Sequence, residues 1–421
     1  MKRGTTGGGA TAPQTRRYFA LDAFRGLAAI GVAIFHFRWT HPELSSCPLF
    51  DRLFNTLDFF FVLSGFVLAH AYLSKPLPLG TFVWRRLARL YPLHVFALLM
   101  FLALQLGKLA VTSLGMSSRN EAFDGMNALN FIDTLFLLQS TGLLWHEIAW
   151  NYPAWTISTE LFSAVAIYAL VAHFGRRAVE PICAAIVLVC IAYVYEFAVQ
   201  PSDYGPNALI RTLCGLAIGC LVYRLHVRFQ PIRGPVWGTI AEVFVILLAY
   251  LLLRSPATKP VWYLVTFGMA AVIYVFAAER GLLSQALRRL QLYRLGTGSY
   301  SIYLNHALVG AIFSKVFLGI APRLGITGTM SAVVYVLTFV GLLMIYSHFT
   351  LRYIERPGRA LWLQAGPLIA ELVRARAQPR PSPVFLARKE RVIAAAGIHA
   401  LSRRVAASSG VRVPESMASA S

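Results

Sequence analysis

The sequence predicts an all-α fold, a polytopic bundle of about ten transmembrane helices with the N- and C-termini on the cytoplasmic side. Hydrophobic residues make up 57% of its 421 residues and charged residues only 14%, whereas soluble chains average about 45–50% and about 25%. The 39 Lys and Arg residues outnumber the 18 Asp and Glu residues, and most of them lie between apolar stretches. This composition excludes disordered, collagen-like and disulfide-stapled chains. The five cysteines form no C-x-x-C pair, so we predict no metal site.

Ten apolar stretches are long enough to cross a bilayer, whose core of about 30 Å requires about 20 residues of helix. They run over residues 20–37, 54–72, 82–106, 155–173, 181–199, 207–223, 237–253, 260–278, 299–318 and 330–351. An eleventh stretch, residues 131–144, is too short to span, and we expect it to lie in the interface or to re-enter the membrane.

The basic residues predict the orientation of these spans, because cytoplasmic loops carry an excess of Lys and Arg. With the N-terminus inside, thirty of the 39 fall on the cytoplasmic side, seven fall outside and two lie within spans. The net charge of +21 therefore reflects membrane topology, and we predict the lipid bilayer, and no nucleic acid, as a partner. The expected location is the cell (inner) membrane.

Composition divides the chain into three parts. Residues 1–18 are rich in Gly and Thr and predict a disordered cytoplasmic tail. Residues 19–357 form the predicted membrane domain. Residues 358–421 predict a basic cytoplasmic tail that contacts anionic lipid.

Ionisable residues inside the first span are candidates for function, because charged groups within a bilayer are costly unless paired or hydrated. Arg25 and His36 are eleven residues apart, close to three full helical turns, so they share one face. Asp22 is spaced to pair with Arg25. Two alternatives remain open: Arg25 reaching the inner surface, and His36 as a satisfied histidine of the bundle.

Two carboxylates are predicted at a depth similar to that of His36. Asp58 and Glu160 each lie about one turn inside a span that enters from the outer side. A general base and its orienting partners require such a group of side chains. Alternatively, each carboxylate is a first-turn acid that is favourable with the helix dipole.

Two further groups of residues are predicted near the ends of spans. Arg85, Arg86 and Arg89 begin the third span at the inner side, where they fit either a topology signal or a clamp for a phosphorylated ligand. In the ninth span, Tyr303 and His306 share a face and, with Tyr300, fit either a cavity lining or an aromatic belt.

Several motifs together resemble those of the membrane acyltransferase-3 family. They are Leu21-Asp22-Ala23-Phe24-Arg25-Gly26 with His36-Phe37, Asp58-Phe59-Phe60-Phe61-Val62-Leu63-Ser64-Gly65-Phe66, Arg85-Arg86-Leu87-Ala88-Arg89, Pro153-Ala154-Trp155-Thr156-Ile157-Ser158-Thr159-Glu160, Leu295-Gly296-Thr297-Gly298-Ser299-Tyr300-Ser301-Ile302-Tyr303-Leu304-Asn305-His306 and Glu355-Arg356-Pro357. The chain departs from the family's usual residues at Ala23, Thr159 and Asn305. None of these departures removes an ionisable group.

The resemblance implies an integral membrane O-acyltransferase that moves an acyl group, usually acetyl, from cytosolic acyl-CoA to a hydroxyl of a surface polysaccharide or glycolipid. Acyl-CoA is then a co-substrate, no cofactor is bound permanently, and enzymes of polysaccharide synthesis are potential partners. Arg25 with Arg85, Arg86 and Arg89 would bind CoA phosphates. His36 would act as general base, or less readily as acyl carrier, with Asp58 or Glu160 setting its tautomer. Tyr300, Tyr303, His306 and Trp155 would contact substrate.

An alternative function of a different class stays open from the residues. His36, Asp58 and Glu160 fit a proton relay in a transporter or flippase of a glycolipid or anionic substrate. Transporters often contain inverted repeats, and the sequence shows no repeat of fixed period.

Overall fold

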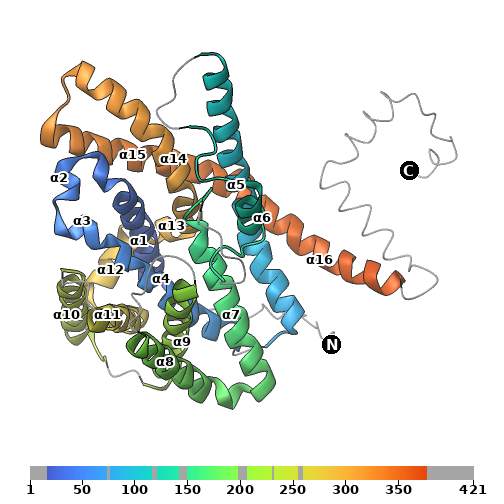
Figure 1. Cartoon of the computed structure of the whole chain (residues 1–421). Coiled ribbons are helices and arrows are strands. Elements are labelled where there is room, and N and C mark those ends of the chain that lie inside the picture. Colours follow the sequence, from blue (N-terminus) through green and yellow to red (C-terminus); the bar gives the residue numbers. More distant parts are fainter. Residues whose placement is uncertain are drawn as a thin grey trace, which may run out of the picture. The chain divides into compact units, whose positions relative to one another are not determined.

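The computed structural model describes residues 17–73, 76–115, 121–141, 149–197, 206–229, 232–254 and 259–376 (Figure 1). Helices dominate these residues, and no strand occurs in them. The helices are α1 (Phe19–Phe37), α2 (Pro42–Ser45), α3 (Pro48–Arg52), α4 (Leu57–Leu68), α5 (Leu79–Ser113), α6 (Ala128–Leu135), α7 (Ala154–Phe174), α8 (Val179–Glu196), α9 (Pro206–Arg228), α10 (Pro235–Arg254), α11 (Lys259–Ala278), α12 (Leu282–Arg289), α13 (Tyr293–Thr297), α14 (Ser299–Ile320), α15 (Gly328–Thr350) and α16 (Arg356–Arg376).

The predicted all-α membrane fold is confirmed. Within the described ranges, nine helices are long and apolar enough to cross a bilayer, and a tenth span arises if a bent pair of helices counts as one. The bent pair joins Tyr263–Ala278 to Leu282–Arg289 at an angle of 74°. It contains most of the eighth predicted span, so the ten predicted spans correspond to nine continuous helices and one broken helix.

A buried glutamate holds the bend between α11 and α12. Glu242 of α10 is 1% exposed, and its carboxylate accepts hydrogen bonds from the backbone N–H groups of Gly281, Leu283 and Ser284 and from the Ser284 hydroxyl. The first N–H groups of a helix have no partner within the helix, and the carboxylate also matches the positive end of the helix dipole. Glu242 therefore stabilises the start of α12.

The helices α4 and α9 pack with their backbones in contact. A Cβ atom built at Gly65 would lie 1.9 Å from the carbonyl oxygen of Leu216, and one at Gly219 would lie 1.9 Å from that of Val62. Small residues at membrane helix contacts permit this approach, which increases van der Waals attraction where no hydrophobic driving force acts between helices. Both positions require glycine for this reason.

The described part of the segment between α5 and α7 contains no helix long enough to cross a bilayer. Its helix α6 has eight residues, which is too short to span. The predicted re-entrant stretch, residues 131–144, begins in this helix, and its last residues lie outside the described ranges. Phe123, Phe131 and Trp150 of the segment pack against Leu98, Ala307 and Leu308 of α5 and α14.

The chain forms two compact units. The described residues up to 79 and from 94 to 348 form the first unit, and residues 80–93 with those from 349 form the second. In the second unit, Trp84 donates its indole N–H to the carbonyl of Trp362 at 3.1 Å, and a Cβ at Gly358 would lie 2.5 Å from that of Pro92.

The predicted C-terminal tail begins at residue 358, which lies within the helix α16. Residues 1–16 and 377–421 of the two predicted tails lie outside the described ranges.

Candidate active site

Close packing of α1 against α13 and α14 brings two histidines together. A Cβ at Gly26 would lie 2.3 Å from the Cβ of Leu295, and one at Gly296 would lie 2.2 Å from the carbonyl oxygen of Asp22. Farther along α1, a Cβ at Gly310 of α14 would lie 2.1 Å from the ring of Phe37. Residue numbers increase in the same direction along α1 and along α13 and α14, so α1 and α14 run parallel. This agrees with their predicted positions as the first and ninth spans.

His36 of α1 and His306 of α14 form a stacked, hydrogen-bonded pair. Their ring centroids are 4.9 Å apart with an angle of 29° between the planes, and Nε2 of His306 lies 3.1 Å from Nδ1 of His36. Nδ1 of His36 also lies 2.9 Å from the carbonyl oxygen of Val32. Nδ1 of His306 contacts the carbonyl oxygen of Tyr303. His306 is fully buried, whereas His36 keeps part of its surface exposed.

The carbonyl contacts determine which ring nitrogens carry protons. A carbonyl only accepts, so Nδ1 of His306 carries a hydrogen, and Nε2 of that neutral ring is an acceptor. Nδ1 of His36 then donates its hydrogen both to Val32 and to His306. Nε2 of His36 consequently holds a lone pair, and it has no hydrogen-bond partner among the described residues. An imidazole with this tautomer presents Nε2 as its proton-accepting atom.

The ring of Tyr152 packs against the rings of both histidines. Its ring centroid lies 4.9 Å from that of His36 and 6.0 Å from that of His306. The residue precedes α7 in the connection from α6. Sequence reasoning missed it, because a single tyrosine outside a span carries no periodic or charge signal.

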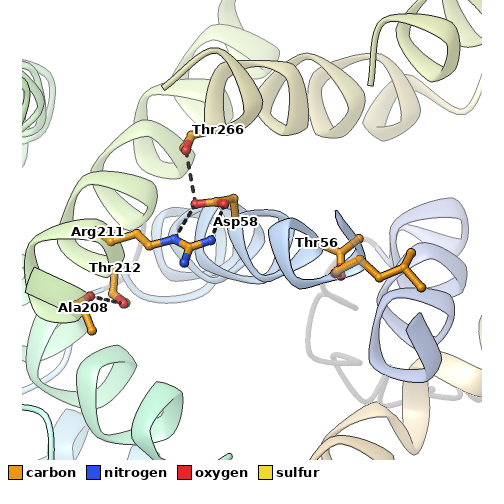
Figure 2. A network of polar contacts seen from close by, with 7 residues as sticks. Thr56, Asp58, Ala208, Arg211, Thr212 and Thr266 are labelled. Carbon is orange, nitrogen blue, oxygen red and sulfur yellow. Dashed lines mark hydrogen bonds and ion pairs between the residues drawn. The ribbon is translucent and has the colours of Figure 1, made fainter. Parts of the chain in front are cut away.

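Asp58 lies in a separate network that includes a residue we did not single out. Its carboxylate accepts hydrogen bonds from Nε and Nη2 of Arg211 at 3.2 and 2.7 Å and from the Thr266 hydroxyl at 3.2 Å (Figure 2). The side chains of Asp58 and Arg211 are 0% and 1% exposed. Figure 2 shows this network joining α4, α9 and α11. The basic charge within the sixth predicted span was the available signal for Arg211.

Glu160 contacts a third site on the bundle. Its carboxylate accepts a hydrogen bond from the Ser64 hydroxyl of α4 at 2.9 Å. The expected contact of Asp58 or Glu160 with His36 does not occur in the described structure. Nδ1 of His36 contacts the Val32 carbonyl and His306, whereas Asp58 binds Arg211. The catalytic roles of the two carboxylates remain predictions.

The four predicted substrate-binding residues differ in how close they lie to His36. His306 lies against His36, and Tyr303, on the same face of α14, accepts a hydrogen bond from the Thr156 hydroxyl at 3.0 Å. Trp155 is 2% exposed and packs its ring against that of Phe61, so it lies in the core of the bundle. Tyr300 is half-buried near the start of α14.

The predicted donor-binding arginines lie in both units. Arg25 of α1 is half-buried, and Asp22, expected as its partner, forms an ion pair of 2.7 Å with Arg17. In the second unit, Arg85 is exposed, Arg89 is half-buried and Arg86 is buried with its guanidinium over the ring of Phe82. Arg85 and Arg89 are four residues apart and share a helix face. Binding of one ligand by Arg25 and these three residues remains a prediction.

A comparison with protein families identifies one family over most of the chain. The sequence model of a family described as an acyltransferase domain (Acyl_transf_3) matches residues 18–348. A protein of Rhizobium radiobacter, named "Protein 2 in picA locus", is 32% identical to this chain over 177 residues, which cover 38% of this chain and 84% of that protein. No solved structure matches the chain. The residues matched by the family model include both histidines, Tyr152 and the Asp58–Arg211 network.

Proposed function

The chain belongs to the acyltransferase-3 family and is a multi-pass membrane acyltransferase, and from this premise we propose that it uses acyl-CoA to acylate a hydroxyl of a glycan or glycolipid. The acyl group is acetyl in this proposal. The observation that carries the proposal is the His36 imidazole, whose Nε2 holds an open lone pair at the contact of α1 with α14.

His36 is the general base of the proposed reaction. Its Nε2 takes the proton of the acceptor hydroxyl while the hydroxyl oxygen attacks the thioester carbonyl of the acyl-CoA. The C–S bond then breaks, and the leaving thiolate takes the proton from His36 to give free CoA. His36 thereby returns to its neutral form. General base catalysis of this kind contributes about 10²- to 10⁴-fold to the rate.

His306 is a positioning residue in this mechanism. Its neutral Nε2 accepts a hydrogen bond from Nδ1 of His36, which keeps the lone pair of His36 on Nε2. The same acceptor and the Val32 carbonyl stabilise the imidazolium that forms during the reaction. Hydrogen bonds to a charged group are stronger than those between neutral groups, so this support increases as His36 takes the proton.

Replacement of His36 by alanine tests the proposal. In purified protein in lipid nanodiscs, we expect His36→Ala to lower transfer of radiolabelled acetyl from acetyl-CoA to a glycan acceptor by at least about 100-fold. His173→Ala is the matched control, because His173 is exposed at the end of α7. Full activity of His36→Ala with an unchanged unfolding temperature would contradict the mechanism.

The arginines of the inner side bind the donor in this proposal. Guanidinium groups fit phosphate oxygens, and Arg85 and Arg89 share one helix face of the second unit. We expect Arg85→Ala combined with Arg89→Ala to raise the KM for acetyl-CoA at least about tenfold, because the loss of even one hydrogen bond to a charged group costs about 1.5–3 kcal/mol, without lowering kcat. An unchanged KM would leave these residues as topology signals. The control is Arg254→Ala, which removes an exposed arginine at the predicted outer side.

The proposal also places the protein in the inner membrane with both termini in the cytoplasm, so that acyl-CoA reaches it from the cytosol. The bias of Lys and Arg between the two sides of the bundle supports this orientation. A transporter mechanism would need Asp58 to exchange protons with His36. Asp58 instead lies in the ion pair with Arg211, so no observation favours the transporter.

A further inference from the structure

Asn151 precedes the tyrosine that contacts both histidines, and it carries an unused hydrogen-bonding atom. The residue is 1% exposed. Its Nδ2 donates to the carbonyl of Leu304 at 3.2 Å, two residues before His306 in α14. Its Oδ1 is buried and has no hydrogen-bond partner in the described part of the chain.

The hydrogen bond to Leu304 fixes the orientation of the Asn151 amide. A carbonyl oxygen cannot donate, so the atom of Asn151 that faces Leu304 is the nitrogen. The oxygen therefore points elsewhere, and its available lone pairs can be used only by a donor. A buried acceptor without a partner costs about 1–3 kcal/mol, and such groups in folded proteins call for an explanation.

The surrounding backbone holds Asn151 firmly in this position. Trp150 has a φ of 42°, a left-handed conformation that is uncommon for a bulky residue. The Trp150 indole donates to Asn130 Oδ1 at 2.8 Å, and the backbone N–H of Ala154 donates to the Asn151 carbonyl at 3.0 Å. Strained backbone of this kind clusters at functional sites, where the surrounding structure maintains it.

We propose that Oδ1 of Asn151 binds a hydroxyl of the acyl acceptor, next to the hydroxyl that His36 deprotonates. This inference rests on the proposed acyltransferase function. The reacting hydroxyl has a single proton, which it donates to Nε2 of His36, so it cannot also donate to Asn151. Asn151 therefore requires a second hydroxyl on the same acceptor. The site is specific for a polyhydroxylated acceptor such as a sugar, and it discriminates against an alcohol with one hydroxyl.

The test uses Asn151→Leu, which keeps the branched shape and the number of side-chain heavy atoms and removes the acceptor oxygen together with the Nδ2 donor to Leu304. The probes are radiolabelled acetyl-CoA with the methyl glycosides of glucose, galactose, mannose and N-acetylglucosamine. Hydrolysis of acetyl-CoA by water is measured in the same samples, because water needs no second hydroxyl. We expect kcat/KM for the best glycoside to fall at least tenfold, while the hydrolysis rate and the KM for acetyl-CoA change less than twofold.

A second arm uses the monodeoxy forms of the best glycoside with both proteins. Wild-type protein should lose at least tenfold in kcat/KM with one deoxy form that retains the acetylated position. Asn151→Leu should use that form and the parent glycoside equally well. Asn151→Ala repeats the measurement if the leucine variant does not fold.

Ser163→Ala is the matched control, because Ser163 is 1% exposed and its hydroxyl also has no partner in the described ranges. It lies within α7, away from the contact with Leu304, and its kinetics should match those of wild type. An unchanged kcat/KM for the glycoside in Asn151→Leu would overturn the inference, as would a parallel fall in transfer and hydrolysis. Wild-type protein that transfers acetyl to none of the four glycosides would instead overturn the proposed function.

Discussion

Two polar groups inside the helix bundle differ in how completely their hydrogen bonds are satisfied. The Asp58–Arg211 pair is fully buried, and each charge meets the opposite charge with additional support from Thr266. The His36–His306 pair is neutral by its hydrogen-bonding pattern, and His36 retains an exposed part and an open lone pair. Both pairs connect helices that are far apart in the sequence.

The difference shows why charge within a membrane span does not by itself identify a reactive group. A charge that is paired on all sides has no capacity left for a substrate, and separating it from its partner is costly. A neutral imidazole with one nitrogen fixed and the other open has a lone pair that can accept a proton from a bound hydroxyl. In our proposal the first pair therefore supplies stability and the second supplies the chemistry.

The largest expected effect is on stability, from breaking the ion pair. Arg211→Ala should lower the free energy of unfolding by about 3–5 kcal/mol, because it leaves the Asp58 carboxylate buried without its counter-charge. Reversible unfolding in detergent micelles measures this loss. The control is Arg224→Ala, whose partner Glu180 is partly exposed, and the loss there should stay below about 1 kcal/mol.

Replacing both charges sharpens the assignment. Asp58→Leu combined with Arg211→Met removes the pair without leaving an unpaired charge, and it should recover most of the stability. Acyl transfer should recover with it. A double variant that is stable but inactive would show that the ion pair takes part in the chemistry, contrary to the comparison.

The next effect is on catalysis, from the positioning histidine. His306→Ala should lower kcat about 100-fold, because His36 loses the acceptor that fixes its tautomer, and the KM of either substrate should change little. His306→Gln keeps an acceptor atom near the position of Nε2 and should recover part of kcat. Equal loss of kcat in both variants, measured by acetyl transfer, would argue that His306 only fills space.

The smallest effect is expected at Ser64. Its hydroxyl donates one hydrogen bond to Glu160 at 2.9 Å, and Ser64→Ala should cost about 1 kcal/mol of stability or a few-fold in rate. Unfolding and transfer assays on the same preparation measure both. A loss of 100-fold in kcat would instead place Glu160 at the centre of the chemistry.

The number of spans and the candidate residue His36 could be predicted from the sequence. A span needs about 20 apolar residues, so length and composition predict ten spans, and the structure has nine helices and one bent pair within its described residues. His36 was identifiable because an imidazole in an apolar helix is unusual. His306 was identified as a residue of the same motif as Tyr303, although its contact with His36 was not foreseen.

The pairing of side chains was decided by the tertiary structure. His36 and His306 are 270 residues apart, and the close approach of α1 to α13 at Gly26 and Gly296, and to α14 at Gly310, brings them together. Asp58 was grouped with His36 from its depth, but depth does not specify the direction around a helix in which a side chain points. The sequence by itself determined which residues lie in the membrane and how many spans carry them. The helix contacts decided which polar groups pair and which one stays open, because hydrogen bonds depend on distance and direction in three dimensions.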